Sequence, residues 1–357
     1  MTGGAMRVAV ACGGTGGHIF PGLATAKELV CRGHDVTLWL AGRDVEVDSV
    51  RDWTGPVIAL KAKGLGGGVF SKTCALTGMV ITVTKAIREM RKNRPDVVLA
   101  MGSYASIGPG IAAKCLQVPL VLHEGNTVPG RAVQLLAPFA SVIGTGFAST
   151  RGLPDHKTVY CGFPVREEVA VVSAQLETPP LLLIVGGSQG AAILNRVVPE
   201  AIHALVSERG KMFQVVHLSG RREYEAVCTR YRGLESVVHV EAFSEEMPKL
   251  YARASLAIAR SGAATCTELA LARLPAILVP FAAATGNHQW HNAQAMTQKG
   301  GFILLDESAC TPAKIMAYLQ ELLLESSRLQ HMREALPGDV IANGASRLAD
   351  VVEKSAT

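Results

Sequence analysis

The sequence lacks the features that mark disulfide-stabilised, zinc-binding and membrane-spanning proteins. Its eight cysteines are dispersed, without a CxxC pair or a Cys/His cluster, which argues against a disulfide framework or a zinc site and favours a reducing compartment. No stretch approaches the roughly 20 apolar residues that a membrane-spanning helix needs. The short apolar run after Arg7 ends in glycines, unlike a secretory signal. We therefore expect a protein that is soluble or lies on a membrane surface.

Aromatic residues are also scarce, but the rest of the composition is that of a folded α/β protein. Aromatics make up 5% of the 357 residues and apolar residues 48%, and 36 residues are glycine. This profile argues against disorder and predicts buried strands joined by tight turns.

The net charge of +5 is concentrated in one segment. Residues 1–163 contain 17 Lys and Arg against 10 Asp and Glu, whereas residues 164–357 contain 18 against 20. Within the first part, residues 61–94 contain eight basic residues and one acid, Glu89. A local basic patch beside a neutral remainder favours an anionic surface or substrate over general nucleic-acid binding.

Part of this basic segment, residues 71–94, also has an apolar stripe at helical spacing. One interpretation is an ordinary amphipathic helix that packs on its sheet and leaves its charges solvated. The alternative is that an exposed portion with Val69, Phe70 and Leu76 contacts anionic lipid, assisted by its basic neighbours.

The chain is predicted to consist of two halves that each alternate strands with helices. Strands of the first half are expected at 7–12, 36–40, 97–100, 120–123 and 141–144. Strands of the second half are expected at 181–185, 214–219, 237–240, 256–259 and 276–280. Helices are expected at 21–32, 72–92 and 107–117, and from about residue 193. Short apolar strands that alternate with helices indicate parallel, doubly wound sheets covered on both faces.

The stretch 169–180 ends in two prolines and reads as a linker between the halves. We therefore predict an α/β fold with two Rossmann-like, doubly wound domains, residues 1–163 and 164–340, that face each other across a cleft. A C-terminal helix, 345–357, is placed to pack back on the first domain. Ligands of such sheets bind beyond the carboxyl ends of the strands.

Glycine-rich turns follow three of the predicted strands: GGTGGH at 13–18, MGSYASIGPG at 101–110 and GGSQGA at 186–191. Such turns let backbone N–H groups approach a phosphate, and the positive end of the following helix adds to the attraction. A single glycine turn is equally explained by tight packing, but two that each open a domain favour phosphate binding. Neither matches the dinucleotide fingerprint GxGxxG.

His18 lies at the entrance of the first helix, beside the glycines. It is either a packing or capping histidine, or a group near a bound substrate or phosphate that accepts a proton near neutral pH. The acids Asp44, Glu46 and Asp48 superficially suggest a metal site, but no second acidic cluster accompanies them, so no metal is predicted there.

The segment RSGAATCTELALA at 260–272 predicts a second anion-binding helix start, opened by Ser261 and Gly262. Glu268 lies two turns in, where a carboxylate can accept hydrogen bonds from two adjacent ribose hydroxyls. A solvated helix glutamate is the plainer interpretation. Further on, Gln289 and Asn292 are suited to sugar hydroxyls.

Taken together, these motifs resemble the MurG family, the N-acetylglucosaminyltransferases of peptidoglycan synthesis, which have the two-domain GT-B fold. The resemblance runs along nearly the whole chain and is carried by GGTGGHIFPG, PDVVLAMGSYAS, VPLVLHEGN, GFPVR, GGSQGA, RSGAATCTE and NHQ with a following NA.

The resemblance implies inverting transfer of N-acetylglucosamine from UDP-N-acetylglucosamine to the 4-hydroxyl of undecaprenyl-pyrophosphoryl-N-acetylmuramyl-pentapeptide, the step from lipid I to lipid II. It implies no metal and no cofactor, because the UDP-sugar is a substrate. It also implies a peripheral position on the cytoplasmic face of the cell membrane, on an anionic lipid surface, and no nucleic-acid partner.

The resemblance further implies the site residues. In the first half they are Thr15, Gly16 and Gly17 of the glycine loop, His18 as candidate base or acceptor contact, and Asn126 and Arg166 in the donor site. In the second half, Ser188 would contact the diphosphate, Ser244 would contact uracil through its backbone, and Gln289 would contact the sugar. The helix that binds the nucleotide would consist of Ala263, Ala264, Thr265, Cys266, Thr267 and Glu268, with Glu268 on the ribose.

The sequence departs from the family pattern at three motifs. GSYAS stands where a double glycine is usual, which introduces Ser103. HEGN stands for HEQN and GFPVR for GNPVR, so that Gly125 and Phe163 replace polar side chains.

The alternative functions on the same fold are those of a lipid glycosyltransferase or a UDP-N-acetylglucosamine 2-epimerase. An alternative of another class is a non-catalytic nucleotide-binding scaffold.

Overall fold

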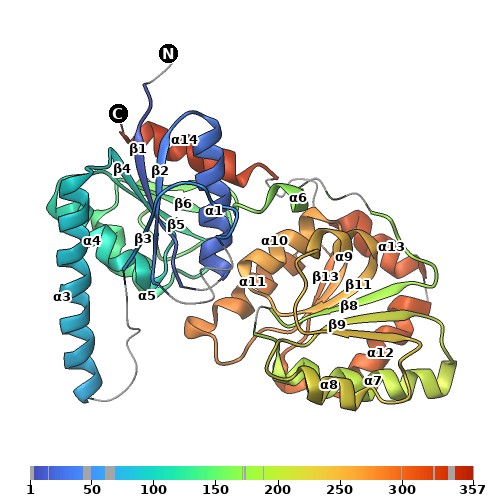
Figure 1. Ribbon diagram of the computed structural model, residues 1–357. Helices are drawn as coiled ribbons and strands as arrows, with labels where there is room; N and C mark the ends of the chain where they lie inside the picture. The colour runs from blue at the N-terminus through green and yellow to red at the C-terminus, as the bar shows by residue number, and fades with distance from the viewer. Residues whose placement is uncertain are drawn as a thin grey trace. The chain divides into compact units, whose positions relative to one another are not determined.

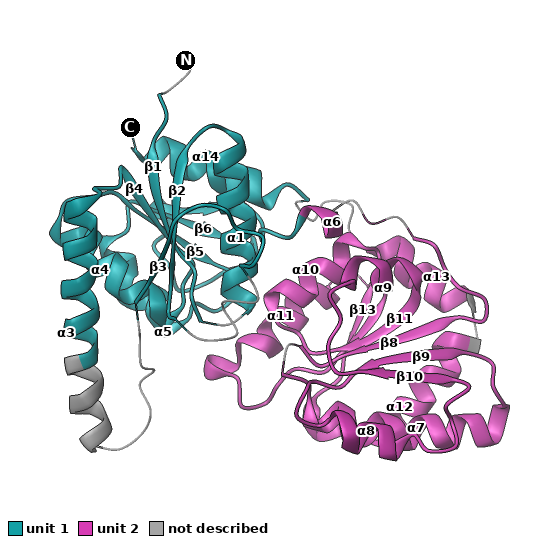
Figure 2. Cartoon of the chain, in the orientation of Figure 1, with its two compact units in different colours: residues 1–166, 341–357 teal, residues 167–340 magenta. Residues whose placement is uncertain are grey.

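The computed structural model describes residues 4–14, 16–42, 50–60, 69–170, 172, 174–187, 189–298, 300–324, 326–336 and 342–356. The chain divides into two compact units (Figures 1 and 2). One consists of residues 1–166 together with 341–357, and the other of residues 167–340. The division therefore falls at Arg166, where the sequence suggested Phe163.

The described part of the first unit is built on a parallel sheet of seven strands, in the order β3-β2-β1-β4-β5-β6-β7. The strands are β1 (Arg7–Ala11), β2 (Asp35–Leu40), β3 (Val57–Ala59), β4 (Val97–Ala100), β5 (Leu120–Glu124), β6 (Val142–Thr145) and β7 (Thr158–Tyr160). The α-helices are α1 (Gly16–Cys31), α3 (Val69–Lys92), α4 (Ile107–Cys115), α5 (Arg131–Leu136) and α14 (Gly344–Ala356).

Both faces of this sheet are covered by helices, and successive side chains of each strand point to opposite faces. Val8 and Val10 of β1 pack with α1 and α14 on one face. Ala9 and Ala11 pack with α3, α4 and α5 on the other. The continuous apolar strands of the sequence are thus strands covered on both faces, as expected for a parallel sheet.

The C-terminal helix α14 belongs to the first unit and lies beside α1 (Figure 1). Leu348, Ala349 and Val352 bury its apolar face. Its polar side is held by Arg32, which donates to Asp350 at 2.6 Å and to Glu353 at 2.9 Å. The far end of the chain is therefore an integral part of the N-terminal unit.

The described part of the second unit repeats the plan with six parallel strands, in the order β10-β9-β8-β11-β12-β13. The strands are β8 (Leu181–Val185), β9 (Gln214–Leu218), β10 (Val238–Glu241), β11 (Ala254–Ala259), β12 (Ala276–Leu278) and β13 (Phe302–Leu304). The α-helices are α6 (Glu167–Ala170), α7 (Ala192–Arg209), α8 (Tyr224–Arg230), α9 (Met247–Arg253), α10 (Ala263–Leu271), α11 (His288–Thr297), α12 (Pro312–Leu319) and α13 (Ser326–Ala335).

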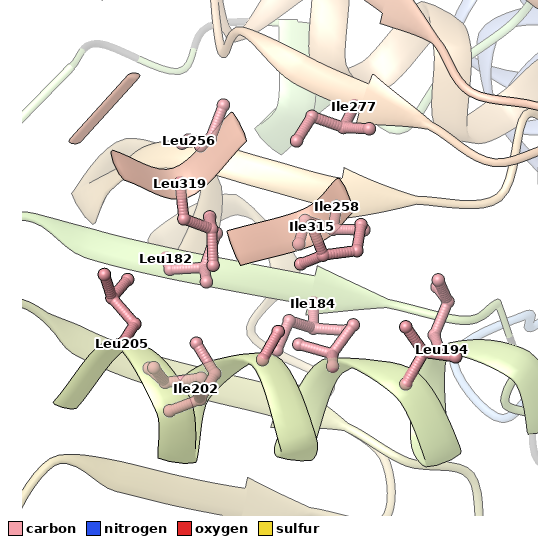
Figure 3. Packing of buried hydrophobic residues seen from close by; sticks show 14 of the residues in the cluster. Leu182, Ile184, Leu194, Ile202, Leu205, Leu256, Ile258, Ile277, Ile315 and Leu319 are labelled. Carbon is pink, nitrogen blue, oxygen red and sulfur yellow. The ribbon is translucent and has the colours of Figure 1, made fainter. Parts of the chain in front are cut away.

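The core of the second unit forms where α7 and α12 cover the central strands. Figure 3 shows Leu182 and Ile184 of β8 in one cluster with Ile202 of α7 and Leu319 of α12. Burial of each such side chain contributes about 1.5–3 kcal/mol to folding.

The elements differ from the sequence expectations mainly at their ends. Helix α1 begins at Gly16 and contains Pro21, although a proline inside a helix forfeits one backbone hydrogen bond and crowds the preceding turn. The short strands β3, β7 and β13, three residues each, were not anticipated. Among the described residues, no helix is long and apolar enough to cross a membrane.

Candidate functional site

In the first unit, the loops that follow β1, β4 and β5 lie at one edge of the sheet, because these neighbouring strands are parallel. Strands β2 and β3 extend the sheet on one side of β1, and β4 to β7 extend it on the other. The place between β1 and β4, where the strand order reverses, is where open α/β sheets bind ligands. Three of the sequence motifs, GGTGGH, MGSYAS and HEGN, occupy these loops.

The first glycine loop requires glycine for steric reasons. A Cβ on Gly13 would lie 2.3 Å from the backbone nitrogen of Ala41. Gly14 has φ +125° and faces the side chain of Ser103, whose Cβ would be 3.4 Å from a Cβ on Gly14. Ser103 therefore packs directly against the loop. Gly16 and Gly17 form the first turn of α1, and Thr15 lies outside the described residues.

His18 joins two of these loops. Its Nδ1 is 2.8 Å from the carbonyl oxygen of Met101, the residue after β4. Since a carbonyl only accepts hydrogen bonds, Nδ1 carries the proton of the neutral ring and Nε2 carries the lone pair. The imidazole is therefore held in the tautomer whose Nε2 can accept a proton.

Glu124 and Asn126 form a carboxylate-centred turn after β5. One Glu124 oxygen accepts from the Asn126 backbone N–H at 2.8 Å and from Asn126 Nδ2 at 3.0 Å. The other accepts from the N–H of Gly130 at 2.8 Å. Burial raises the pKa of Glu124, partly offset by these hydrogen bonds. Glu124, which sequence reasoning missed, thus fixes the loop that presents Asn126; an acid at the end of a buried strand was the available signal.

His123, next to Glu124, is fully enclosed. Burial lowers its pKa to about 4, with a backbone hydrogen bond to Gly162 acting in the opposite direction and the charge of His18 adding to the effect. Its ring meets Phe163 edge-on, with 5.7 Å between ring centroids. Phe163 therefore places an aromatic ring against a histidine that is neutral near pH 7. Nearby, the guanidinium of Arg166 lies over the ring of Phe20, at 5.3 Å.

In the second unit, the glycine loop after β8 also depends on close backbone approach. Gly190 has φ +76°, and a Cβ there would lie 2.0 Å from the carbonyl oxygen of Ser219. That carbonyl is held in turn by Asn195 Nδ2 at 2.9 Å. Buried His217 donates from Nε2 to Asn195 Oδ1 at 3.0 Å. Ser188 lies in this loop but outside the described residues.

The nucleotide helix predicted from the sequence is α10, which follows β11 directly. Gly262 is its N-cap residue, and the space around Gly262 is open, with no atom within 4 Å of the place that a Cβ would occupy. Gly262 has no side chain that could accept from the first turn, and the N–H groups at a helix start attract anions. Ser261 Oγ donates to the Gln289 carbonyl at 2.9 Å, and Asn292 Nδ2 to the Ser261 carbonyl at 3.2 Å. These bonds join the start of α11 to the start of α10.

The six predicted residues on α10 differ in exposure, so that some can contact a ligand and others only pack inside the unit. Ala264, Thr265 and Glu268 are partly exposed, whereas Cys266 and Thr267 are buried, as is Ala263. Burial raises the pKa of the Cys266 thiol to about 12, so Cys266 packs and does not act as a nucleophile. Glu268 accepts from the hydroxyl of Tyr251 at 2.8 Å, a partner that sequence reasoning missed.

Gln289 is attached to the loop after β12. Its Oε1 accepts from the N–H of Phe281 at 3.0 Å. The same loop is held by Arg260, which donates to the carbonyls of Val279 and Pro280 at 3.1 and 2.9 Å and to Glu307. The structure thus brings Gln289 and the α10 start together in one hydrogen-bonded frame.

Ser244 lies farther away along the same sheet edge, after the edge strand β10. Its Oγ accepts from the N–H of Glu246 at 3.4 Å. Among the described residues, no group of three or more His, Cys, Asp or Glu side chains is placed to hold a metal ion. Asp44, Glu46 and Asp48 lie outside that part of the chain.

Comparison with known proteins places the chain in a family. The glycosyltransferase family 28 N-terminal domain matches residues 8–145, and the family 28 C-terminal domain matches residues 181–352. A UDP-N-acetylglucosamine–N-acetylmuramyl-(pentapeptide) pyrophosphoryl-undecaprenol N-acetylglucosamine transferase of Ectopseudomonas mendocina is 37% identical, over 91% of this chain and 92% of that protein. A protein of the same name from Rhodospirillum rubrum is 34% identical, over 98% and 92%.

The crystal structure of Acinetobacter baumannii MurG superposes with a TM-score of 0.79 at 29% identity, over 98% of this chain and 99% of that one. The chain belongs to the MurG family. It is a glycosyltransferase, and the predicted GT-B type fold with two parallel-sheet, Rossmann-like units is confirmed.

Membership of the MurG family explains why the two units each carry a glycine loop and a helix start at the carboxyl edge of a sheet. The residues predicted for the MurG-type site lie in separate units: His18, Asn126 and Arg166 in the first, and the α10 residues and Gln289 in the second.

Proposed function

We propose that this chain transfers N-acetylglucosamine from UDP-N-acetylglucosamine to the 4-hydroxyl of a lipid-linked N-acetylmuramyl-pentapeptide pyrophosphate, with inversion at the anomeric carbon. The reaction is proposed from the names of the relatives, which state this donor sugar and this acceptor. The observation of this chain that supports it best is the hydrogen bond that joins Gln289 to Ser261 at the start of α10, on a helix whose second turn carries Glu268.

The second unit is proposed to bind the donor. The N–H groups at the start of α10 and the glycine loop with Ser188 would hold the diphosphate, because a helix start attracts negative charge. Glu268 would accept hydrogen bonds from the ribose hydroxyls, and Gln289 would contact the sugar. Ser244 would meet uracil through its backbone.

The same groups would stabilise the UDP leaving group, whose charge grows as the glycosidic bond breaks. Fixed backbone dipoles stabilise such charge without reorganising during the reaction. We therefore propose that transfer needs neither a metal ion nor a cofactor.

The first unit is proposed to bind the acceptor and to supply the base. His18 is the candidate, because its bond to Met101 leaves the lone pair on Nε2 and an imidazole accepts protons near neutral pH. General-base catalysis of this kind contributes about 10²- to 10⁴-fold in rate. Thr15, Gly16 and Gly17 would contact the acceptor or phosphate from the same loop, and Asn126 and Arg166 would reach the donor.

The test is transfer of labelled N-acetylglucosamine from its UDP donor to the lipid-linked acceptor in the presence of EDTA. Product in EDTA is expected, and it would establish the acceptor class and the metal independence together. Product only after a divalent cation is added would refute metal independence. Binding of UDP without transfer would point to another lipid acceptor, and formation of UDP-N-acetylmannosamine without any acceptor would point to the epimerase.

We also propose that helix α3 brings the enzyme to an anionic membrane surface on the cytoplasmic face. Val80, within the apolar stripe of residues 71–94, and its neighbour Ile81 are 57% and 54% exposed. Farther along the helix, a hollow of about 480 Å³ is lined by Thr84, Ile87, Arg88, Arg91 and Lys92. Exposed apolar side chains next to cations are suited to a lipid surface. The side chains of Val69, Phe70 and Leu76 lie outside the part of the chain that the structure describes.

Co-sedimentation with phosphatidylglycerol vesicles tests this surface. Replacing Val80 and Ile81 together with serine is expected to weaken vesicle binding about tenfold or more. Met212→Ser, at a residue 53% exposed in the second unit, is the matched control and is expected to leave binding unchanged. Equal binding by both variants, or equal binding to phosphatidylcholine vesicles, would contradict the proposal.

A further inference from the structure

Tyr251 is a buried phenol that none of the proposed catalytic steps uses. It lies on α9 and is 2% exposed. Helix α9 packs against α6 and against strand β8, and it leads directly into β11 and α10. The ring is therefore fixed by packing, and its hydroxyl is a fixed donor.

The hydroxyl of Tyr251 donates to Oε2 of Glu268 at 2.8 Å. Glu268 is on the second turn of α10 and is partly exposed. A glutamate side chain has several rotatable bonds, and ordering it upon ligand binding costs conformational entropy. A donor that holds the carboxylate in one orientation before the ligand arrives removes part of that cost.

We propose that Tyr251 is a positioning residue that orients Glu268 for the ribose of the nucleotide and thereby sets selectivity for the ribose hydroxyls. This inference rests on the proposed ribose contact of Glu268. Tyr251 does not touch the substrate; it acts through the carboxylate. Hydrogen bonds to a charged acceptor are stronger than neutral ones, so loss of this one is expected to be measurable.

The experiment is calorimetric titration of UDP, 2′-deoxy-UDP and 3′-deoxy-UDP into the full-length chain, in wild-type, Tyr251→Phe and Glu268→Gln forms. Wild type is expected to bind UDP about tenfold more tightly than at least one deoxy analogue. Tyr251→Phe is expected to bind UDP about tenfold more weakly than wild type and to distinguish the analogues by less than about threefold. In turnover, the same variant is expected to raise KM for the UDP-sugar and to change kcat less than about twofold.

Tyr231→Phe is the matched control. Tyr231 is 3% exposed in the same unit, and its hydroxyl bonds to His217 Nδ1 at 2.9 Å, away from Glu268. It is expected to retain both the affinity for UDP and the preference over the deoxy analogues. If Tyr251→Phe and Tyr231→Phe weaken UDP binding equally, the effect is one of packing and the inference fails.

The outcomes separate this inference from the proposal on which it rests. If Glu268→Gln still prefers UDP over the deoxy analogues as strongly as wild type does, the ribose contact of Glu268 is wrong and the inference falls with it. If Glu268→Gln loses that preference while Tyr251→Phe keeps it, only the role of Tyr251 is wrong. Because UDP is the ligand, neither result depends on the acceptor.

Discussion

The ion pair between Arg260 and Glu307 allows a direct test of what stabilises the loop to which Gln289 is bonded. Arg260 donates to both Glu307 oxygens, at 3.2 and 3.1 Å, and Glu307 also accepts from the N–H of Ala282 at 2.7 Å. Together with the bonds from Arg260 to Val279 and Pro280, this pair fixes the loop that holds Gln289. The guanidinium also lies over Phe281, at 5.2 Å.

The perturbation is Glu307→Gln, which keeps the shape of the side chain and removes its charge. Removing one partner of a fully buried ion pair costs about 3–5 kcal/mol. Here the side chain of Glu307 is 23% exposed, and Arg260 keeps two carbonyl acceptors. We therefore expect a loss of about 2 kcal/mol in the free energy of unfolding, and about a tenfold rise in KM for the UDP-sugar because Gln289 loses its support.

The assay is urea unfolding of the full chain. Trp290, the one tryptophan between residues 167 and 340, reports this unit by fluorescence. Burial alone would raise the pKa of Glu307, but the hydrogen bonds and charge of Arg260 and the Ala282 N–H outweigh it and lower the pKa. A lowered pKa means that the stabilisation is complete above the unfolded value of about 4.3 and is lost as the pH falls through the lower folded value.

Glu246→Gln is the control, since its ion pair with Lys249 is exposed in the same unit and exposed pairs contribute little. The deficit of Glu307→Gln is expected to be complete at pH 7 and to shrink below about pH 4. A deficit no larger than that of Glu246→Gln, or one that is constant with pH, would refute the assignment of the loop's stability to this ion pair.

Three further predictions concern the two glycine loops and the buried histidine that follows the second of them in the sequence. His18→Gln keeps a donor for Met101 but lacks a basic nitrogen, so kcat is expected to fall about 10²- to 10³-fold. The affinity for UDP, measured by calorimetry, is expected to be unchanged, and undiminished turnover would show that His18 is not the base. Gly190→Ala places a Cβ 2.0 Å from a carbonyl oxygen, whereas a Cβ at Gly187, which has φ +84°, meets open space. In thermal unfolding, the free energy of unfolding is expected to fall by roughly 2 kcal/mol or more for Gly190→Ala and by about 1 kcal/mol for Gly187→Ala, and equal losses would be inconsistent with the packing. Burial lowers the pKa of His217 to about 3, so unfolding of the second unit takes up a proton below about pH 6.5, and that unit loses about 2 kcal/mol of stability between pH 7 and pH 5. In urea unfolding followed through Trp290, this loss should be absent in His217→Gln and retained in His331→Gln, at an exposed histidine of the same unit.

The strands and the glycine turns were predictable because their signals are local. Five consecutive apolar residues at 181–185 form β8 with the expected bounds, since a strand buried on both faces must be apolar throughout. The short strands β3, β7 and β13 were not predicted because three residues carry almost no periodicity. Strand β12 is equally short but was predicted, because its apolar run continues through Val279. The start of α1 was misplaced because Pro21 was taken as its first residue.

The sequence could nominate a candidate site residue only where a motif contains that residue. His18, Glu268 and Gln289 each lie within a motif that the sequence presents as a unit. Their supporting partners come from other segments: Met101 is 83 residues from His18, and Tyr251 is 17 residues from Glu268. Glu307 is 47 residues from Arg260. A buried tyrosine or a lone glutamate has no local pattern that announces its partner.

The sequence alone therefore determined the α/β class and the two-part organisation, because apolar periodicity and glycine turns are properties of consecutive residues. The resemblance to the family also came from the sequence, because each of its motifs is a short continuous segment. Tertiary structure alone decided which nitrogen of His18 carries the lone pair, which donor orients Glu268 and which ion pair holds the loop of Gln289. It also decided that α14 completes the first unit through Arg32. The physical reason is that hydrogen bonds and ion pairs depend on distances of about 3 Å, which only the folded chain sets between segments far apart in the sequence.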